Sequence, residues 1–335
     1  MTERKLRWGI ISTAEIAVSV IIPSIRESSR NEVLAISSRH IEQAEEVAER
    51  CHIPRFYGSY EEMLDDPDID AVYIPLPNHL HKEWTIKSAQ AGKHVLCEKP
   101  AALDAVDAAE MVDMCRKQGV VFAEGFMYRY HPKHARVREI IHSGEIGMLR
   151  SMHGRFTSNN ADDLENVRYR REMGGGSLYD LGVYPVSAAR MYFGAEPTAV
   201  TVHAMFSAKH DHVDMMASGL LEFPNSRSAT FECGMWAYPS CALEIIGTKG
   251  RIKLPYAFRR DDSEDEPQIT IYTDEGKREE HIELANHFAL QVDAFAAAVL
   301  DGTPLPYSPE DAIRNTRVIA ACLESARKGE KIRIV

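Results

Sequence analysis

Short apolar runs alternate with amphipathic stretches in the first third of the chain. Five of these runs are rich in β-branched and other apolar residues; they cover 6–11, 33–38, 70–76, 93–98 and 120–126. Helix-like patterns such as 41–51 and 104–117 separate them. This alternation is typical of βαβ units. It predicts an α/β domain over residues 1–125, in which helices cover a doubly wound parallel sheet.

The pattern changes after a predicted linking helix at 132–143. Four strand-like runs then follow one another with turns and little helix between them: 198–208, 216–224, 228–237 and 242–248. Two helical patterns close the chain, at 286–302 and 308–329. Strands joined by short turns favour antiparallel pairing. We therefore predict a second, α+β domain over residues 126–335 with a large, open, mostly antiparallel sheet.

Composition and charge exclude several classes of protein. The chain has 335 residues, 44% of them hydrophobic, which suits two folded domains. No long apolar segment follows the first basic residues, so we expect neither a secretory signal nor a membrane span, and a cytoplasmic protein. Six cysteines without a CxxC pair favour reduced, mostly buried thiols. A net charge of -11 without a basic cluster argues against a nucleic-acid partner.

The segment GIISTAEI, residues 9–16, joins the first predicted strand to a helix. A dinucleotide-binding fold places its pyrophosphate on the amides of such a turn, where glycines allow close backbone approach. Here Ser12, Thr13 and Ala14 follow Gly9, so the spacing persists with small residues in place of glycines. The alternative is an ordinary connection in which Ser12 or Thr13 caps the helix. The turn alone does not decide between the two.

The second predicted strand ends in Ser37, Ser38 and Arg39, where such folds bind the adenosine ribose. An acidic residue there would accept from the ribose hydroxyls and repel a phosphate. Ser38 and Arg39 instead offer donors to a 2′-phosphate, and the guanidinium can stack on adenine. The alternative is a surface arginine that opens a helix. The pattern favours NADP, with NAD still possible.

Two histidine motifs and a charged tripeptide need separate interpretations. His79 and His81 form an HxH pair after a strand, but no further ligand follows at a recognisable spacing, so a helix start beside the cofactor cleft is preferred to a metal site. The run KHDHVD, 209–214, is better explained as a hairpin turn, and the acidic run 259–267 as a solvated loop. Lys99, in the tripeptide EKP that begins at the end of the fourth apolar run, is placed where it can act on a substrate oxygen.

A triple glycine, 174–176, precedes a helical pattern that carries Asp180 and Tyr184. Residues four apart lie on one face of a helix, so a carboxylate and a phenol would stand together. With Lys99 they would form an acid/base group for chemistry at a carbinol. The alternative is an amphipathic helix with a buried tyrosine.

Taken together, these motifs resemble those of the glucose-fructose oxidoreductase, inositol dehydrogenase and rhizopine-catabolism (Gfo/Idh/MocA) family. The likeness rests on the turn at 8–17, GKHVLCEKP, FMYRYHP, GEIGMLRSM and the DxGxY of GGGSLYDLGVYPVSAARMYFG, and it is greatest to the dihydrodiol and aldose dehydrogenase branch. The resemblance implies an N-terminal Rossmann domain and a C-terminal α+β domain whose open sheet is often the dimer surface. It also implies a Lys-Pro bond that is often cis.

The resemblance assigns roles to residues of this chain. Lys99, Asp180 and Tyr184 would be catalytic, and inositol oxidation is disfavoured because inositol-type relatives have histidine in place of Tyr184. The expected cofactor contacts are Ser12, Thr13, Ala14, Glu15, Ile16, Ser38, Arg39, Pro75, Leu76, Pro77, Asn78, His81, Glu98 and Lys99. Weaker candidates are Arg129 and Arg168 at the rim of the substrate pocket and Trp236 in the pocket, with Tyr184 at its centre.

The function expected from this sequence is that of an NAD(P)-dependent dehydrogenase acting on CH–OH groups. Its substrate would be a sugar or another cyclic polyol, an aldose before a trans-dihydrodiol, with no metal, nucleic acid or membrane involved. The alternative is an inactive nicotinamide- or sugar-sensing regulator of the same family. A homodimer or homotetramer is expected, because few helices are available to cover both faces of the second sheet.

Overall fold

The chain forms two compact units in the computed structural model, which describes residues 4–259 and 267–334. Unit 1 contains Met1–Met127 and Asn286–Ile313, and unit 2 contains Tyr128–Ala285 and Arg314–Val335. The acidic run 259–267, predicted to be a solvated loop, lies outside the described residues except at its two ends.

Unit 1 is built on a six-stranded parallel sheet with the strand order β3-β2-β1-β4-β5-β6. Its strands are β1 (Leu6–Ile11), β2 (Asn31–Ser37), β3 (Arg55–Tyr57), β4 (Ala71–Ile74), β5 (His94–Glu98) and β6 (Phe122–Gly125). Its helices are η1 (Ala17–Ile21), α1 (Ile22–Glu27), α2 (Ile41–Arg50), α3 (Tyr60–Leu64), η2 (Asn78–Leu80), α4 (His81–Gln90), α5 (Ala105–Gln118) and α8 (His287–Asp301). The predicted parallel sheet is therefore confirmed. Its order reverses between β1 and β4, and open sheets of this kind bind ligands outside the carboxyl ends of the strands at such a point.

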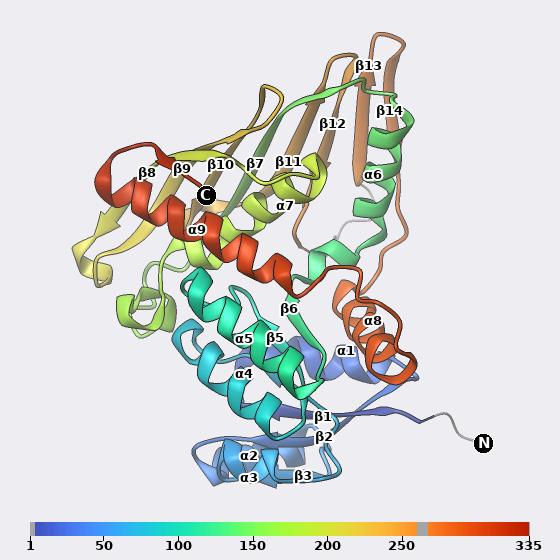
Figure 1. The fold of residues 1–335 in the computed structure, drawn as a ribbon, viewed down its shortest axis with the longest axis vertical. Helices are drawn as coiled ribbons and strands as arrows, with labels where there is room; N and C mark the ends of the chain where they lie inside the picture. The colour runs from blue at the N-terminus through green and yellow to red at the C-terminus, as the bar shows by residue number, and fades with distance from the viewer. Residues whose placement is uncertain (1–3, 260–266, 335) are drawn as a thin grey trace. The chain divides into compact units, whose positions relative to one another are not determined.

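Helices cover both faces of this sheet. One core cluster joins α3, α4 and α5 to one face, and the other joins α1, α2 and α8 to the opposite face. Figure 1 shows α4 and α5 side by side, and Lys82 of α4 forms an ion pair with Asp107 of α5 at 2.5 Å. Because helices cover both faces of the sheet, the loops at the carboxyl ends of its strands are the expected place for a ligand.

One segment of unit 1 differs from the predicted domain division. The prediction assigned everything after residue 125 to the second domain, whereas α8 returns to the first. The reason is apolar packing: Phe295 of α8 lies 5.1 Å from Trp8 of β1 between ring centroids, and Val292 and Ala296 are fully buried in the same cluster. The chain thus passes between the units three times, and the third crossing lies inside α9 (Glu310–Lys328).

Unit 2 is built on a nine-stranded sheet with the order β14-β13-β12-β11-β7-β10-β9-β8-β15. Its strands are β7 (Leu149–Asn159), β8 (Ala199–Ser207), β9 (Val213–Phe223), β10 (Arg227–Gly234), β11 (Trp236–Gly247), β12 (Gly250–Pro255), β13 (Ile269–Thr273), β14 (Gly276–Glu280) and β15 (Ile332–Arg333). The other elements are η3 (Met127–Tyr130), α6 (Pro132–Ser143), η4 (Val167–Tyr169), η5 (Arg171–Met173), η6 (Leu178–Gly182), α7 (Val183–Phe193) and η7 (Ala208–His210). β7 and β10 pair in parallel, and the other neighbouring strands of this sheet pair antiparallel, so the predicted mostly antiparallel sheet is confirmed.

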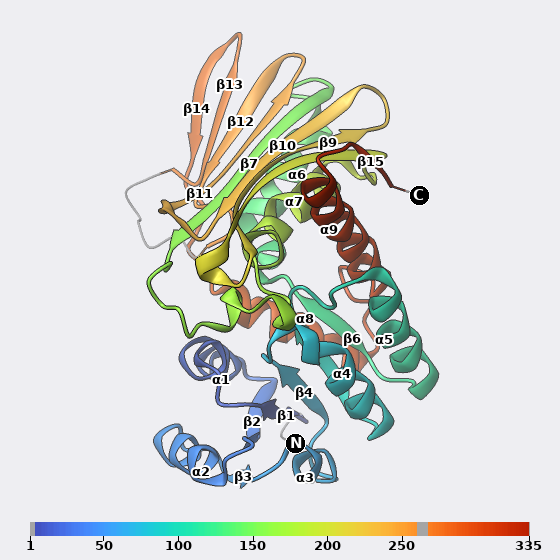
Figure 2. The same ribbon diagram turned by 90° about the vertical axis from the view of Figure 1, so that its left-hand side faces the viewer.

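The helices of unit 2 lie on one side of its sheet (Figure 2). α7 approaches β7 so closely that a Cβ atom at Gly154 would stand 2.6 Å from Cβ of Pro185. One predicted strand is divided: the apolar run 228–237 ends β10 at Gly234 and begins β11 at Trp236. Trp236, which the prediction placed inside a single strand, therefore opens β11.

Two further predictions concern the whole chain. All six cysteines are free; five are buried and Cys51 is half-buried, which confirms the expected thiols. Among the helices of residues 4–259 and 267–334, none has the length and apolar character needed to cross a membrane.

Candidate active site

The turn after β1 is tight and leads directly into a helix. Ser12 adopts a φ of 98°, a left-handed conformation that usually favours glycine. Its Oγ accepts a hydrogen bond from the backbone N–H of Ala14 at 3.0 Å, and its own N–H donates to the carbonyl of Ser37 at 3.0 Å. The helical stretch that begins at Glu15 and Ile16 leads into the π-helical turn η1. The first amides of a helix have no intrahelical partner and so can bind an anion.

The end of β2 presents one exposed cation. Ser38 is buried, and its Oγ accepts from the N–H of His40 at 3.2 Å and donates to Oε1 of Gln43 at 3.4 Å. Arg39 is exposed. Burial raises the pKa of Tyr60, and the neighbouring guanidinium of Arg39 opposes that increase. Arg39 is therefore better placed than Ser38 to reach a phosphate.

His81 connects the loops that follow β4 and β5. It is fully buried; Nε2 lies 2.7 Å from the carbonyl oxygen of Leu76, and Nδ1 lies 2.8 Å from that of Pro100. Burial lowers the pKa of His81, and the two carbonyl contacts oppose this. Its prediction as a direct cofactor contact is wrong, because both ring nitrogens face protein carbonyls. His81 instead ties the segment Pro75–Asn78 to the loop that carries Lys99.

Glu98 also holds the loop that carries Lys99. Its Oε1 accepts from the hydroxyl of Tyr73 at 2.7 Å, and its Oε2 accepts from the N–H of Lys99 at 3.2 Å. The Lys99–Pro100 bond is cis, as the resemblance implies. Lys99 itself is half-buried at the carboxyl end of β5. Pro77 and Asn78 are half-buried after β4, the neighbour of β5 in the sheet.

In unit 2, Asp180 and Tyr184 stand on one continuous helical stretch. Its first turn, η6, is π-helical, and α7 follows directly, so the predicted helix is present but begins in a wider turn. π turns are rare and are often found at functional sites. Tyr184 is buried, with 5% of its surface exposed. It packs against Phe156 and Phe258, with ring centroids 5.0 and 5.6 Å away.

Asp180 has a cationic partner within unit 2 that the sequence did not reveal. Its Oδ2 lies 3.0 Å from Nε of Arg168, whose side chain is 47% exposed. This ion pair raises the pKa of Arg168. The partial exposure of Arg168 fits its predicted place at a pocket rim.

The other two candidates for the substrate pocket behave differently. Arg129 is buried and donates from Nε and Nη2 to Oγ of Ser187 at 3.0 and 2.7 Å. It supports α7 one turn beyond Tyr184, so its prediction at a rim is wrong. Trp236 is 38% exposed, with its ring 6.5 Å from that of His210. Within the described residues, no group of three or more His, Cys, Asp or Glu side chains is arranged to hold a metal.

Comparisons with known proteins identify the family of both parts of the chain. Residues 6–126 match an oxidoreductase family with an NAD-binding Rossmann fold, and residues 134–253 match the GFO/IDH/MocA C-terminal domain. The chain is 36% identical to an NADP-dependent D-xylose 1-dehydrogenase of Haloferax volcanii, over 98% of this chain and 100% of that one. It is 34% identical to the trans-1,2-dihydrobenzene-1,2-diol dehydrogenase of Mus musculus over 74% of each chain. A solved 3-ketoreductase from Actinomadura kijaniata, in complex with NADP and TDP-benzene, has a TM-score of 0.90 and 30% identity, covering 96% of this chain and 98% of that chain.

Proposed function

The chain belongs to the Gfo/Idh/MocA family of oxidoreductases, and from this premise we propose that it oxidises a ring carbinol of an aldose with NADP as its cofactor. The observation that carries the proposal is the pairing of Asp180 and Tyr184 on one helical stretch. A phenol there can take a hydroxyl proton while the carboxylate orients a neighbouring hydroxyl. When bound, NADP supplies the acceptor for the two electrons that leave the substrate carbon.

The cofactor is assigned to unit 1. Thr13, Ala14, Glu15 and Ile16 offer the turn and helix amides to the pyrophosphate, and Arg39 offers its guanidinium to the 2′-phosphate. Pro77 and Asn78 follow β4 at the reversal of strand order, where the nicotinamide is expected. The positive φ of Ser12 supports the fit, because it reproduces the tight turn without a glycine. The proposed catalytic cation is Lys99, whose backbone is held by Glu98.

An aldose is favoured over a trans-dihydrodiol. The Arg168–Asp180 ion pair offers both donors and an acceptor to sugar hydroxyls. A site built for such hydroxyls leaves its own polar groups unpaired when a hydrocarbon ring binds. The full-length similarity to a D-xylose dehydrogenase supports the same choice. The expected reaction is oxidation at the anomeric carbon, with a lactone as product.

A panel of pentoses, hexoses, inositols and dihydrodiols, assayed for NADPH formation, tests this proposal. We expect activity on one or more aldoses, with dihydrodiols slower and inositols inactive. Activity on inositols alone, or on nothing in the panel, would reject the proposed substrate class. A sugar that raises the melting temperature of the NADP-bound protein without turnover would identify a sensor instead.

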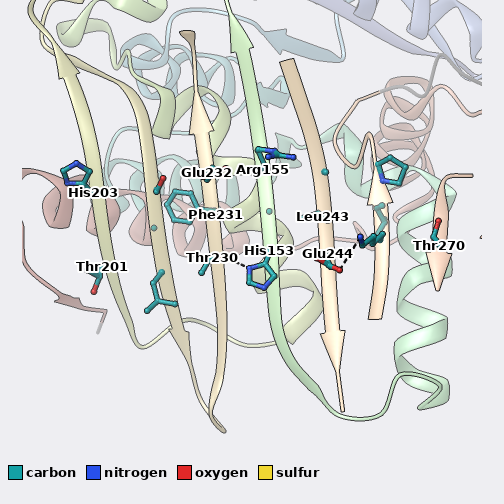
Figure 3. Close-up of a pocket in the computed structure, with 18 residues that line it drawn as sticks. His153, Arg155, Thr201, His203, Thr230, Phe231, Glu232, Leu243, Glu244 and Thr270 are labelled. Carbon is teal, nitrogen blue, oxygen red and sulfur yellow. Dashed lines mark hydrogen bonds and ion pairs between the residues drawn. The ribbon is translucent and has the colours of Figure 1, made fainter. Parts of the chain in front are cut away.

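We further propose that two copies of the chain associate through the outer face of the unit 2 sheet. We define this outer face by the side chains that point away from α7: His153, Arg155, Thr201, His203, Ser218, Leu220, Thr230, Glu232 and Glu244. Figure 3 shows several of them on neighbouring strands, around a depression of about 980 Å³. Among the described elements of unit 2, no helix lies on this side. A broad, partly apolar sheet face of this kind favours a protein partner.

Sedimentation at micromolar concentration is expected to show a dimer or tetramer. Leu220 lies on the outer face and is 37% exposed. A two-fold interface contains each residue twice, so Leu220→Asp would introduce two carboxylates into it. We expect this variant to shift the protein strongly toward monomer. Val106→Asp is the matched control, since Val106 is 67% exposed on α5 of unit 1. A wild-type protein that is monomeric throughout this concentration range would contradict the proposal.

A further inference from the structure

The turn between β8 and β9, together with the start of β9, contacts residues 161–178, which lead from β7 into the helix of Asp180 and Tyr184, at three points. Nε2 of His210 lies 2.9 Å from the carbonyl oxygen of Ala161. Oδ2 of Asp211 accepts from the N–H of Arg171 at 2.7 Å. Asp214, the last residue of the KHDHVD run, reaches Ser177 and Leu178. The sequence interpretation of this run as a hairpin turn is confirmed, because β8 and β9 pair antiparallel on either side of it.

The third contact is the most enclosed. Asp214 is 99% buried, since only 1% of its surface is exposed. Its Oδ2 accepts from Oγ of Ser177 at 2.8 Å and from the N–H of Leu178, the first residue of η6, at 2.7 Å. A carboxylate at this end of a helix is favourable because the N-terminal amides carry partial positive charge. The side chain thus fixes the start of the helical stretch that carries Asp180 and Tyr184.

A glycine makes room for this arrangement. Gly176 has a φ of 119°, and a Cβ atom there would stand 2.1 Å from Oδ1 of Asp214. The N–H of Gly176 donates to the carbonyl of Arg168 at 3.0 Å, and the carbonyl of Gly176 accepts from the N–H of Asp180 at 3.0 Å. The backbone therefore brings Arg168 back to the helix at the turn where it pairs with Asp180. The carboxylate of Asp214 lies beside Gly176, between these two backbone bonds.

We propose that Asp214 is a positioning residue for the reaction: it holds the first turn of the catalytic helix, and through it the directions of Asp180 and Tyr184. This inference rests on the proposed function, because it assigns Asp180 and Tyr184 to the chemistry. Asp214 itself touches neither substrate nor cofactor. Its effect passes through Ser177 and Leu178 to the residues that do.

The ionisation of Asp214 gives this role a signature. Burial raises the pKa of Asp214 to about 6, against the opposing effect of the bonds from Leu178 and Ser177. The charged and titratable groups that face it are Arg327 of α9 and Cys233 of β10, whose Sγ also lies 3.5 Å from Oγ of Ser177. As the pH falls through about 6, the carboxylate gains a proton and both bonds lose their charge assistance. We expect kcat to fall over that range.

Stability should change in the opposite direction. An unfolded aspartate titrates near about 3.9, so between about 4 and 6 the folded protein binds more protons at this site than the unfolded chain. The contribution of Asp214 to stability therefore decreases as the pH rises through that window. If Asp214 served stability alone, kcat would not fall at the acidic pH values where protonation of Asp214 stabilises the fold.

The test compares Asp214→Asn with Glu280→Gln on the active aldose of the panel. Glu280 of β14 accepts from Nε and Nη2 of Arg136 at 2.8 and 3.0 Å, so it is a paired carboxylate in the same unit, bonded to α6 and not to the stretch that carries Asp180 and Tyr184. We expect Asp214→Asn to lower kcat by about tenfold or more, with the Kd of NADP unchanged and the decline of kcat below pH 6 abolished. Glu280→Gln should lower the melting temperature and leave kcat and its pH profile as in the wild type.

Ser177→Ala provides a second route if Asp214→Asn does not fold, because it removes one of the two donors and keeps the carboxylate. Ser177→Ala should also lower kcat, but by less than Asp214→Asn. A folded Asp214→Asn variant, or Ser177→Ala if Asp214→Asn does not fold, with the kcat and the pH profile of the wild type would overturn the positioning role. Absence of turnover by the wild type on the whole panel would reject the proposed function, and with it this role.

Discussion

Lys99→Ala and Tyr184→Phe are each expected to lower kcat by about two orders of magnitude or more, with little change in the Kd of NADP. The phenol of Tyr184 is the proposed acid/base group, and general acid/base catalysis commonly contributes a factor of this size. The ammonium group of Lys99 is proposed to favour loss of the proton from the same phenol. The double variant should therefore be much less than multiplicative. Steady-state kinetics on the active aldose, together with cofactor titration, measure all three effects.

Tyr192→Phe is the control for this experiment. Tyr192 is a buried tyrosine on the same helix as Tyr184, and its hydroxyl lies 2.6 Å from Nδ1 of His134. Loss of that hydroxyl should cost stability and leave kcat near the wild-type value. A Tyr184→Phe enzyme with near-normal turnover would reject the assigned base.

The pH dependence of kcat separates the two proposed roles. A free phenol titrates near about 10, so a base that works near neutrality needs its pKa lowered by about 2 to 3 units, which corresponds to about 3 to 4 kcal/mol. A nearby cation lowers such a pKa. If Lys99 supplies that charge, the rise of kcat with pH should move to higher pH in Lys99→Ala. A loss of activity without that displacement would assign Lys99 to substrate binding alone.

Arg39→Asp is expected to reverse the preference between the two cofactors. Loss of a charge-assisted contact, together with repulsion of the 2′-phosphate by the new carboxylate, should weaken NADP binding by about 10- to 100-fold. The carboxylate can also accept from the ribose hydroxyls of NAD, which should strengthen NAD binding. The Kd values of both oxidised cofactors, measured by fluorescence titration, give the ratio.

Arg50→Asp is the matched control for the cofactor experiment. Arg50 is 57% exposed on α2, and its replacement changes the net charge by the same amount. It should leave the ratio of the two Kd values close to that of the wild type. Tighter binding of NAD than of NADP by the wild-type protein would show that the end of β2 was misinterpreted.

Local patterns were sufficient to predict the core of unit 1. Alternating apolar and amphipathic runs identified the parallel sheet, whereas the small residues after β1 were compatible with either a phosphate turn or a capped helix. The position of α8 could not be predicted in this way. Its own pattern shows only that one face is apolar, whereas its place depends on packing between Phe295 and Trp8, which are far apart in sequence.

The candidate site was predictable to a similar extent. Spacing placed Asp180 and Tyr184 on one helical face, and the structure retains both on one stretch. The π turn, the Arg168 ion pair and the carboxylate of Asp214 were missed, because each depends on contacts between segments that no local pattern records. His81 was misassigned for the same reason: the motif reveals a polar residue in a loop, and only the fold shows two carbonyl groups around it.

The central claim is direct transfer of hydrogen from a sugar carbon to NADP. An active aldose from the panel, labelled with deuterium at its anomeric carbon, tests it most directly when the NADPH produced is analysed by mass spectrometry. We expect each NADPH to carry the substrate's deuterium, and Tyr184→Phe to form the same labelled product far more slowly. NADPH without deuterium would contradict oxidation at that carbon.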